Sequence, residues 1–203
     1  MIELPDAAGD EADRSRPTAG GIGGIGGIGG IGGIGGIGGT GGTEPRSKVI
    51  SWHDPHTLAE AGRTLTGADF LRRMAARILP APPIAELMGM TIRSIDVGDV
   101  VFECEPDEST YNPLGIVHGG LACTLLDTVT GCAVHSTLPV GVGYASLEIK
   151  VNYLRPIHGG TPILAHGWVT KPGRRVAFAD ADLRDPSGVL LATASSTCLV
   201  VAG

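Results

Sequence analysis

The stretch NPLGIVHGGLACTLLD, residues 112–127, decides how this chain of 203 residues is read. It starts as a loop and passes through a His-Gly-Gly step into a strongly apolar run. Between Glu108 and Glu148 the only formally charged side chain is Asp127. A carboxylate in apolar surroundings costs free energy unless it is paired or used. The stretch therefore predicts a helix that carries one functional acid.

That helix is predicted from Gly119 to about Ser136, and it is hydrophobic on every side. Its apolar residues are Leu121, Ala122, Leu125, Leu126, Val129, Cys132, Ala133 and Val134. A helix without a polar face has to be enclosed by other elements. The elements that can enclose it are strands, because residues 90–106 read as two strands about a Gly-Asp turn and four strand candidates follow the helix. These four cover 144–154, 161–171, 174–184 and 189–201. We therefore predict the α+β class, with an antiparallel sheet wrapped around one long central helix.

The chain divides into three regions of different composition. Residues 1–47 combine acidic residues with a Gly-Gly-Ile repeat, and glycine this dense loses much backbone entropy on ordering, so we predict a disordered tail. Residues 48–83 are predicted to be a helical N-terminal extension, because 67–79 has helical spacing and PAPP follows it. Residues 84–203 form the predicted main domain.

Composition excludes several classes of protein. The net charge is −6 and no strongly basic face is implied, which argues against a nucleic-acid partner. No run of 18 apolar residues exists, so no membrane span is expected, and without a signal-like start the default location is the cytoplasm. The four cysteines show no C-x-x-C spacing and are expected to be reduced core residues. In His53-Asp54-Pro55-His56 the proline spoils a ligand face, so no metal is expected.

With these elements in place, the chain resembles hotdog-fold proteins, and most closely the PaaI-type acyl-CoA thioesterases. The resemblance covers roughly 84–201 and rests on a set of residues in order along the chain. They are Asn112, Gly115, His118-Gly119-Gly120, Asp127, the strand from Ser146 to Tyr153, and Arg155-Pro156. It implies hydrolysis of an acyl-CoA by a homodimer or a dimer-of-dimers tetramer, with the sites at the dimer interface. No cofactor is implied.

The chemistry of the motif can also be argued from the residues. A thioester carbonyl docked on the backbone N–H of Gly119 or Gly120 would be polarised, and its developing oxyanion stabilised by the helix start. Once ionised, Asp127 would activate water as a general base or attack the carbonyl itself. The sequence leaves both roles open.

The spacing of the motif predicts a composite site. Gly120 and Asp127 share one face of a helix but lie about 10.5 Å apart along its axis. An oxyanion donor and an attacking group must each lie about 3 Å from one carbonyl group. The His-Gly-Gly end and Asp127 that serve one thioester are therefore expected to come from different subunits.

Other roles follow from the resemblance, position by position. It implies that Asn112 positions substrate or water, that His118 supports the loop, and that Ser146 orients the attacking water. His118 is also better read as a residue that fixes the loop than as a catalytic base. Lys171, Arg174 and Arg175 could bind coenzyme A phosphates, but solvated charge in a hairpin turn explains them equally well.

Three further interpretations compete with this one. Asp127 could be a structural acid satisfied by Thr124 and Thr128. Cys123 is a weak nucleophile candidate, because it does not share a helix face with His118. At the level of the whole protein, a non-catalytic module that binds acyl-CoA is the main alternative. An enoyl-CoA hydratase is the weaker one, because the Asp/His arrangement of such proteins is not found here.

Overall fold

The computed structural model of the chain describes residues 44–202. The predicted tail therefore lies outside the described residues, except for 44–47. The helices are α1 (Pro55–Thr64), α2 (Gly67–Ala75), α3 (Pro83–Met88) and α4 (Gly119–Ser136), with a short 3₁₀ turn at Glu108–Thr110. The strands are β1 (Met90–Asp96), β2 (Asp99–Cys104), β3 (Val142–Tyr153), β4 (Ile163–Lys171), β5 (Val176–Arg184) and β6 (Leu190–Ala202).

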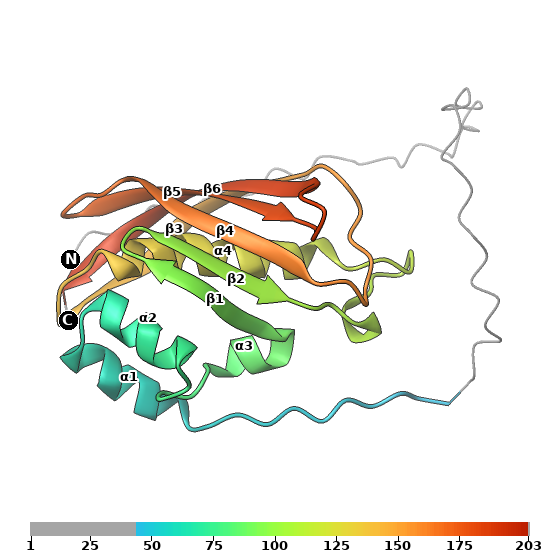
Figure 1. Cartoon of the computed structure of the whole chain (residues 1–203), viewed down its shortest axis with the longest axis horizontal. Helices are drawn as coiled ribbons and strands as arrows, with labels where there is room; N and C mark the ends of the chain where they lie inside the picture. Colours follow the sequence, from blue (N-terminus) through green and yellow to red (C-terminus); the bar gives the residue numbers. More distant parts are fainter. Residues whose placement is uncertain (1–43, 203) are drawn as a thin grey trace, which may run out of the picture. The chain divides into compact units, whose positions relative to one another are not determined.

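All six strands form one antiparallel sheet in the order β1-β2-β4-β5-β6-β3. The sheet curls over α4, which lies in its concave side (Figure 1). This arrangement confirms the predicted α+β class and the sheet wrapped around one long central helix. α4 begins and ends where the sequence predicts, and each strand that follows it agrees within two residues. β3 is an edge strand, which pairs with β6 alone within residues 44–202.

The core sits between α4 and the sheet. Leu125, Leu126 and Val129 on α4 are fully buried, as are Val100 on β2 and Ala165 on β4. One side of α4 differs from this pattern, and its half-buried residues recur at helical spacing. They are Cys123, Thr124, Asp127, Thr128, Cys132 and His135. The expectation that α4 is enclosed on every side is therefore wrong along this stripe, which we call the open stripe of α4.

Two glycines allow the elements around α4 to approach closely. A Cβ atom on Gly131 would lie 2.4 Å from the hydroxyl oxygen of Tyr144, so glycine there makes room for the Tyr144 ring of β3 against the helix. A Cβ atom on Gly67 would lie 1.7 Å from the carbonyl oxygen of His135. The Gly67 N–H also donates to the Leu138 carbonyl at 3.1 Å, which fixes the start of α2 against the end of α4.

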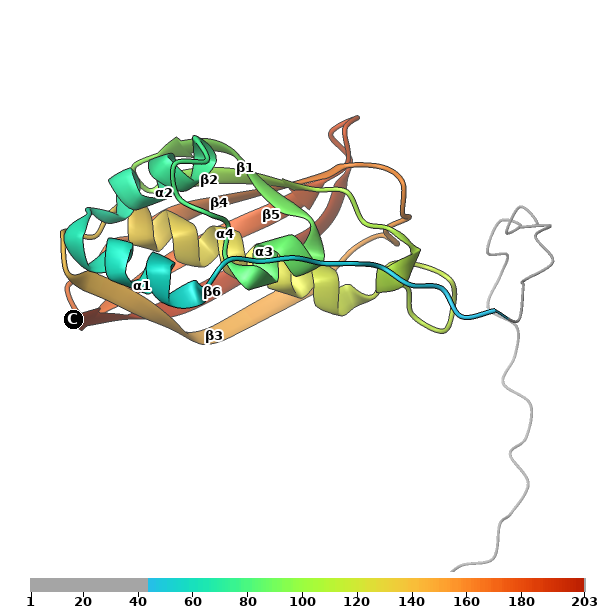
Figure 2. The same ribbon diagram turned by 90° about the horizontal axis from the view of Figure 1, so that it is seen from below.

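The N-terminal helices cover α4 on the side opposite the middle of the sheet, as the view from below shows (Figure 2). α1 begins where Asp54 accepts a hydrogen bond from the His56 N–H at 2.9 Å, with Pro55 at the first helical position. The motif 53–56 is thus a helix start. The predicted helix 67–79 ends earlier, at Ala75, because Arg77 adopts a φ of 57° that no helix can continue through. Among residues 44–202, no helix is both long and apolar enough to cross a membrane.

Candidate active site

Two of the predicted site residues meet across 19 positions of sequence. The Ser146 hydroxyl donates a hydrogen bond to Oδ1 of Asp127 at 2.8 Å. Asp127 is half-buried on the open stripe of α4, and Ser146 is exposed on β3, where the pairing with β6 shifts register between Ser146 and Glu148. The irregular register lies immediately beside Ser146. The contact fixes one carboxylate oxygen of Asp127 and leaves the other without a hydrogen-bond donor among the described residues.

The threonines next to Asp127 do not satisfy its carboxylate. The Thr124 hydroxyl donates to the Gly120 carbonyl at 2.9 Å, and the Thr128 hydroxyl donates to the Thr124 carbonyl at 2.8 Å. Each hydroxyl carries one proton, so neither can also donate to Asp127. The interpretation of Asp127 as a structural acid held by these two threonines is therefore wrong.

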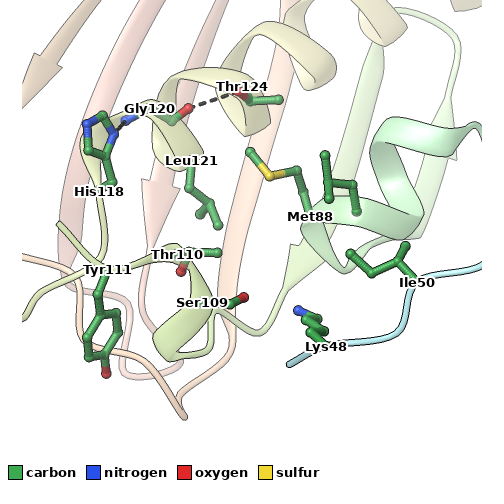
Figure 3. Close-up of a pocket in the computed structure, with 11 residues that line it drawn as sticks. Lys48, Ile50, Met88, Ser109, Thr110, Tyr111, His118, Gly120, Leu121 and Thr124 are labelled. Carbon is green, nitrogen blue, oxygen red and sulfur yellow. Dashed lines mark hydrogen bonds between the residues drawn. The ribbon is translucent and has the colours of Figure 1, made fainter. Parts of the chain in front are cut away.

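At the start of α4, His118 is the N-cap residue. Its Nδ1 atom accepts a hydrogen bond from the Gly120 N–H at 2.7 Å (Figure 3). Accepting this bond requires Nδ1 to be unprotonated, so the ring is neutral with its proton on Nε2. The histidine holds the loop in place, and it engages Gly120 rather than Cys123.

The cap also changes which amide is available for a ligand. Gly120 was expected to be one of two free donors, but its N–H is already used by His118. The Gly119 N–H has no acceptor among residues 44–202, as is usual in the first turn of a helix. The Gly119 carbonyl accepts a hydrogen bond from the Tyr153 hydroxyl at 3.1 Å, which ties the helix start to the end of β3. Gly119 therefore presents a fixed and unoccupied N–H.

Asn112 organises the loop that leads into α4. Its Oδ1 atom accepts from the Leu114 N–H at 2.8 Å and from the Ile116 N–H at 3.4 Å. Gly115 turns the chain between them with a φ of 74°, a conformation that glycine adopts without strain. The Nδ2 group of Asn112 has no acceptor among the described residues, so the side chain can fix the loop and still offer a donor.

Two cavities lie along α4, and they share no lining residue. The first, of about 590 Å³, lies beside Gly120 and His118, and its lining includes Lys48, Ser109 and Tyr111 (Figure 3). The second, of about 750 Å³, lies beside Asp127 and is lined by residues of α1, α2, the α3 region, α4 and the start of β3. In one chain the two halves of the predicted site thus open into different spaces.

Comparison with known proteins identifies the family of the chain. Residues 114–192 match the family model for the thioesterase superfamily. Human acyl-coenzyme A thioesterase 13 is 30% identical over 129 residues, which is 63% of this chain and 91% of the human protein. The chain belongs to the thioesterase superfamily.

Solved structures show which members of the thioesterase superfamily this chain is similar to. The phenylacetic acid degradation-related protein of Ralstonia eutropha JMP134 is 30% identical, with a TM-score of 0.59, and the match covers 64% of this chain and 98% of that one. A Streptococcus mutans protein bound to acetyl CoA is 26% identical, with a TM-score of 0.52, over 56% of this chain and 89% of that one. These similarities confirm the predicted hotdog fold and the PaaI-type resemblance.

The basic turn of the thioesterase-superfamily domain lies far from the start of α4. Lys171, Arg174 and Arg175 are exposed around the turn between β4 and β5. Leu199 of β6 pairs with both Val176 and Ala145, so this turn lies at the same end of the sheet as Ser146. The Gly119 carbonyl is hydrogen-bonded to Tyr153, which lies eight residues beyond Ala145 along β3, or about 26 Å away. One chain therefore does not bring these three side chains to its own Gly119.

The thiols of Cys104 and Cys132 are made less reactive by burial. Burial raises the pKa of the Cys132 thiol to about 12 and that of the Cys104 thiol to about 11. Both are therefore protonated near neutral pH, and all four cysteines are free. Within residues 44–202, no three His, Cys, Asp or Glu side chains are grouped as metal ligands.

Proposed function

We propose that the chain hydrolyses an acyl-CoA thioester with a small or medium acyl group to the free acid and coenzyme A. Membership of the thioesterase superfamily and similarity to a protein bound to acetyl CoA support this substrate class. The observation that carries the proposal is the hydrogen bond from Ser146 to Asp127 at 2.8 Å. It holds the one acid of an apolar helix at the edge of a large cavity, with a carboxylate oxygen still available.

In the proposed reaction the thioester carbonyl oxygen accepts a hydrogen bond from the Gly119 N–H. Asp127 takes a proton from a water molecule as the water oxygen bonds to the carbonyl carbon. The oxyanion then collapses to the carboxylic acid as the C–S bond breaks, and the proton held by Asp127 passes to the leaving thiolate, which gives the free thiol. The positive end of α4 and its fixed N–H stabilise the negative charge on the oxyanion. Direct attack by the Asp127 carboxylate is the alternative; it releases the thiolate and forms a mixed anhydride. If water then attacks the Asp127 carbonyl of that anhydride, ¹⁸O from labelled water enters Asp127, an outcome that the general-base route does not give.

The reacting groups are proposed to come from two copies of the chain. Gly119 and Asp127 are eight residues apart on one continuous helix, or about 12 Å along its axis. Three features support a second copy at this place: the open stripe of α4, the unpaired edge of β3, and the exposed apolar side chains Leu147 and Leu154. An antiparallel edge strand is a ready template for pairing with another chain. A two-fold dimer would set each Asp127 beside the partner's Gly119.

The first test is release of free thiol from a panel of acyl-CoA substrates. We expect turnover by the native chain and its near-complete loss in Asp127→Asn, which keeps the shape of the side chain and removes its charge. If the native chain binds acyl-CoA tightly but releases no thiol above background, the hydrolase proposal is wrong. A non-catalytic acyl-CoA-binding module would then be the better description.

Subunit mixing tests the composite site separately. We expect Asp127→Asn and Asn112→Ala homodimers to be inactive, because each lacks one half of both sites. Random exchange between the two gives mixed dimers that contain one intact site, so activity should return to about a quarter of the native value. Mixtures that stay inactive, despite measured exchange, would show that one chain provides the whole site.

The basic turn is still proposed to bind the phosphates of coenzyme A through Lys171, Arg174 and Arg175. The coenzyme A molecule concerned would be bound between the two subunits. The turn that carries them lies at the Ser146 end of the sheet, and Asp127 is bonded to Ser146. Replacing all three by glutamine should raise KM for acyl-CoA and leave KM for the corresponding acyl-pantetheine unchanged. If KM changes equally for both substrates, these three residues do not bind the phosphates and are solvent-exposed charges in a turn.

A further inference from the structure

The cavity beside Asp127 is built mainly by the N-terminal helices. Leu58, Gly62 and Arg63 of α1 line it, as do Phe70 and Met74 of α2, and α4 and β3 close the other side. We call this space the α1–α2 chamber. Its volume of about 750 Å³ lies within the range of sites that hold small organic ligands. A surface-padding role for the extension would not require such a space.

One side of the α1–α2 chamber is formed by a row of uncharged aromatic rings. The rings of Phe70 and His135 have centroids 5.5 Å apart, and those of His135 and Tyr144 are 5.6 Å apart, so one row of rings joins α2, α4 and β3. Burial lowers the pKa of His135, which keeps its ring neutral near pH 7. The charged residues on the lining are Asp127 and Arg63. A wall of this kind favours an apolar ligand group over a charged one.

We propose that the α1–α2 chamber holds the acyl group of the thioester, and that α1 and α2 set the largest acyl group accepted. The inference rests on the proposed function, because hydrolysis requires the thioester carbonyl to lie beside Asp127. The acyl carbons follow directly from that carbonyl, and the chamber is the apolar space that opens there. The cavity beside Gly120 combines apolar side chains with Lys48 and several hydroxyl groups, so it offers hydrogen-bonding partners to the amide-rich arm of coenzyme A.

Gly62 is the position at which this assignment can be tested. It lies within α1 and lines the chamber, and a Cβ atom added there would lie 3.8 Å from Cε2 of Phe70. That distance is an ordinary van der Waals contact, so a side chain at this position does not clash at its first atom. A larger side chain extends into the chamber and removes part of its volume. Gly62→Leu therefore shortens the chamber while leaving Asp127, Ser146 and Gly119 in place.

The experiment measures kcat/KM for thiol release over a series from acetyl-CoA to dodecanoyl-CoA. For Gly62→Leu we expect about a tenfold or greater loss with decanoyl- and dodecanoyl-CoA, because a few carbon atoms decide fit in an apolar pocket. Acetyl-CoA turnover should stay within about twofold of the native value. The matched control is Thr57→Leu, which adds a similar side chain on the exposed side of α1, away from the chamber, and should leave the whole series unchanged. Thermal melting of each variant verifies that it is folded.

Equal loss for every chain length in folded Gly62→Leu, or no loss at all, would overturn the inference. Binding of non-hydrolysable alkyl-CoA thioethers, measured by calorimetry, separates this inference from the proposed function. If the native chain releases no thiol but binds dodecyl-CoA more tightly than ethyl-CoA, and Gly62→Leu removes that difference, the chamber assignment stands and the hydrolase proposal fails. Native affinity that does not change with alkyl length would overturn the chamber assignment.

Discussion

Replacing His118 by alanine removes the acceptor that holds the first turn of α4. The native side chain accepts the Gly120 N–H at 2.7 Å, and the same turn presents the Gly119 N–H. Loss of an N-cap acceptor costs about 1 kcal/mol of stability. For a domain of this size that corresponds to a fall in Tm of roughly 2–4 °C. We therefore expect His118→Ala to fold and to melt slightly earlier than the native chain.

The effect on turnover distinguishes a positioning role from proton transfer. Removing an oxyanion donor completely costs roughly 100- to 1000-fold in kcat, but here the Gly119 amide stays and only its orientation loosens, so we expect about a tenfold loss. Asparagine is a strong N-cap residue, and its Oδ1 can replace Nδ1 as the acceptor, so His118→Asn should recover most of the lost rate. The assay is kcat and KM for thiol release, with Tm measured in parallel.

A different result would refute this reasoning. If His118 were the general base, alanine and asparagine variants would both lose roughly 100- to 10,000-fold, because neither side chain accepts a proton near neutral pH. Equal inactivity of two folded variants would therefore assign proton transfer to His118 and remove the case for Asp127 as the base.

Three further predictions follow from contacts in the same region. Ser146→Ala should lower kcat about tenfold and lower Tm by a few degrees, because a hydrogen bond to the Asp127 carboxylate is worth about 1.5 kcal/mol. An unchanged kcat would show that Ser146 does not orient the acid. Gly67→Ala should lower the free energy of unfolding in urea by about 1–3 kcal/mol, since its Cβ meets the His135 carbonyl, whereas Gly62→Ala meets nothing closer than 3.8 Å and should be neutral or stabilising. Burial lowers the folded-state pKa of His135, so the stability that its neutral ring contributes is present above pH 6.5 and is lost as the pH falls below that value. His135→Gln should therefore reduce the drop in Tm between pH 7.5 and 5.5. An unchanged drop would show that His135 is not the group responsible.

The elements of the fold could be predicted because their signals are local. The apolar run of α4 and the alternation and turns of the last four strands lie within short windows of sequence, and these elements were placed within two residues. The sequence pattern does not single out α1, because His53-Asp54-Pro55-His56 resembles a set of metal ligands, although an acid before a proline is a helix-start signal. Arg77 ended α2 early through a positive φ that no residue pattern announces.

The candidate site could be predicted only in part from the sequence, because its contacts join residues that are distant along the chain. Asp127 and Ser146 were both picked out by the family resemblance, and the contact between them depends on how β3 lies against α4. The capping of Gly120 by His118 was missed because histidine is not among the preferred N-cap residues. The α1–α2 chamber gives no sequence signal at all, because residues 58–84 and 127–144 line it together only after folding.

A Gly119 amide and an Asp127 carboxylate can be brought to the same thioester in two ways, which differ greatly in free energy. Within one chain, α4 would have to break between them, over about two turns of a helix that runs without interruption from Gly119 to Ser136. That break would also expose Leu125 and Leu126, which are fully buried, and burying each such side chain contributes about 1.5–3 kcal/mol. A second copy requires no change in α4, and it would further cover the half-buried open stripe and pair with the edge of β3 that is free among residues 44–202. Association is therefore the less costly route to a complete site, and dilution below the dimer dissociation constant should abolish turnover while the helical circular-dichroism signal stays intact.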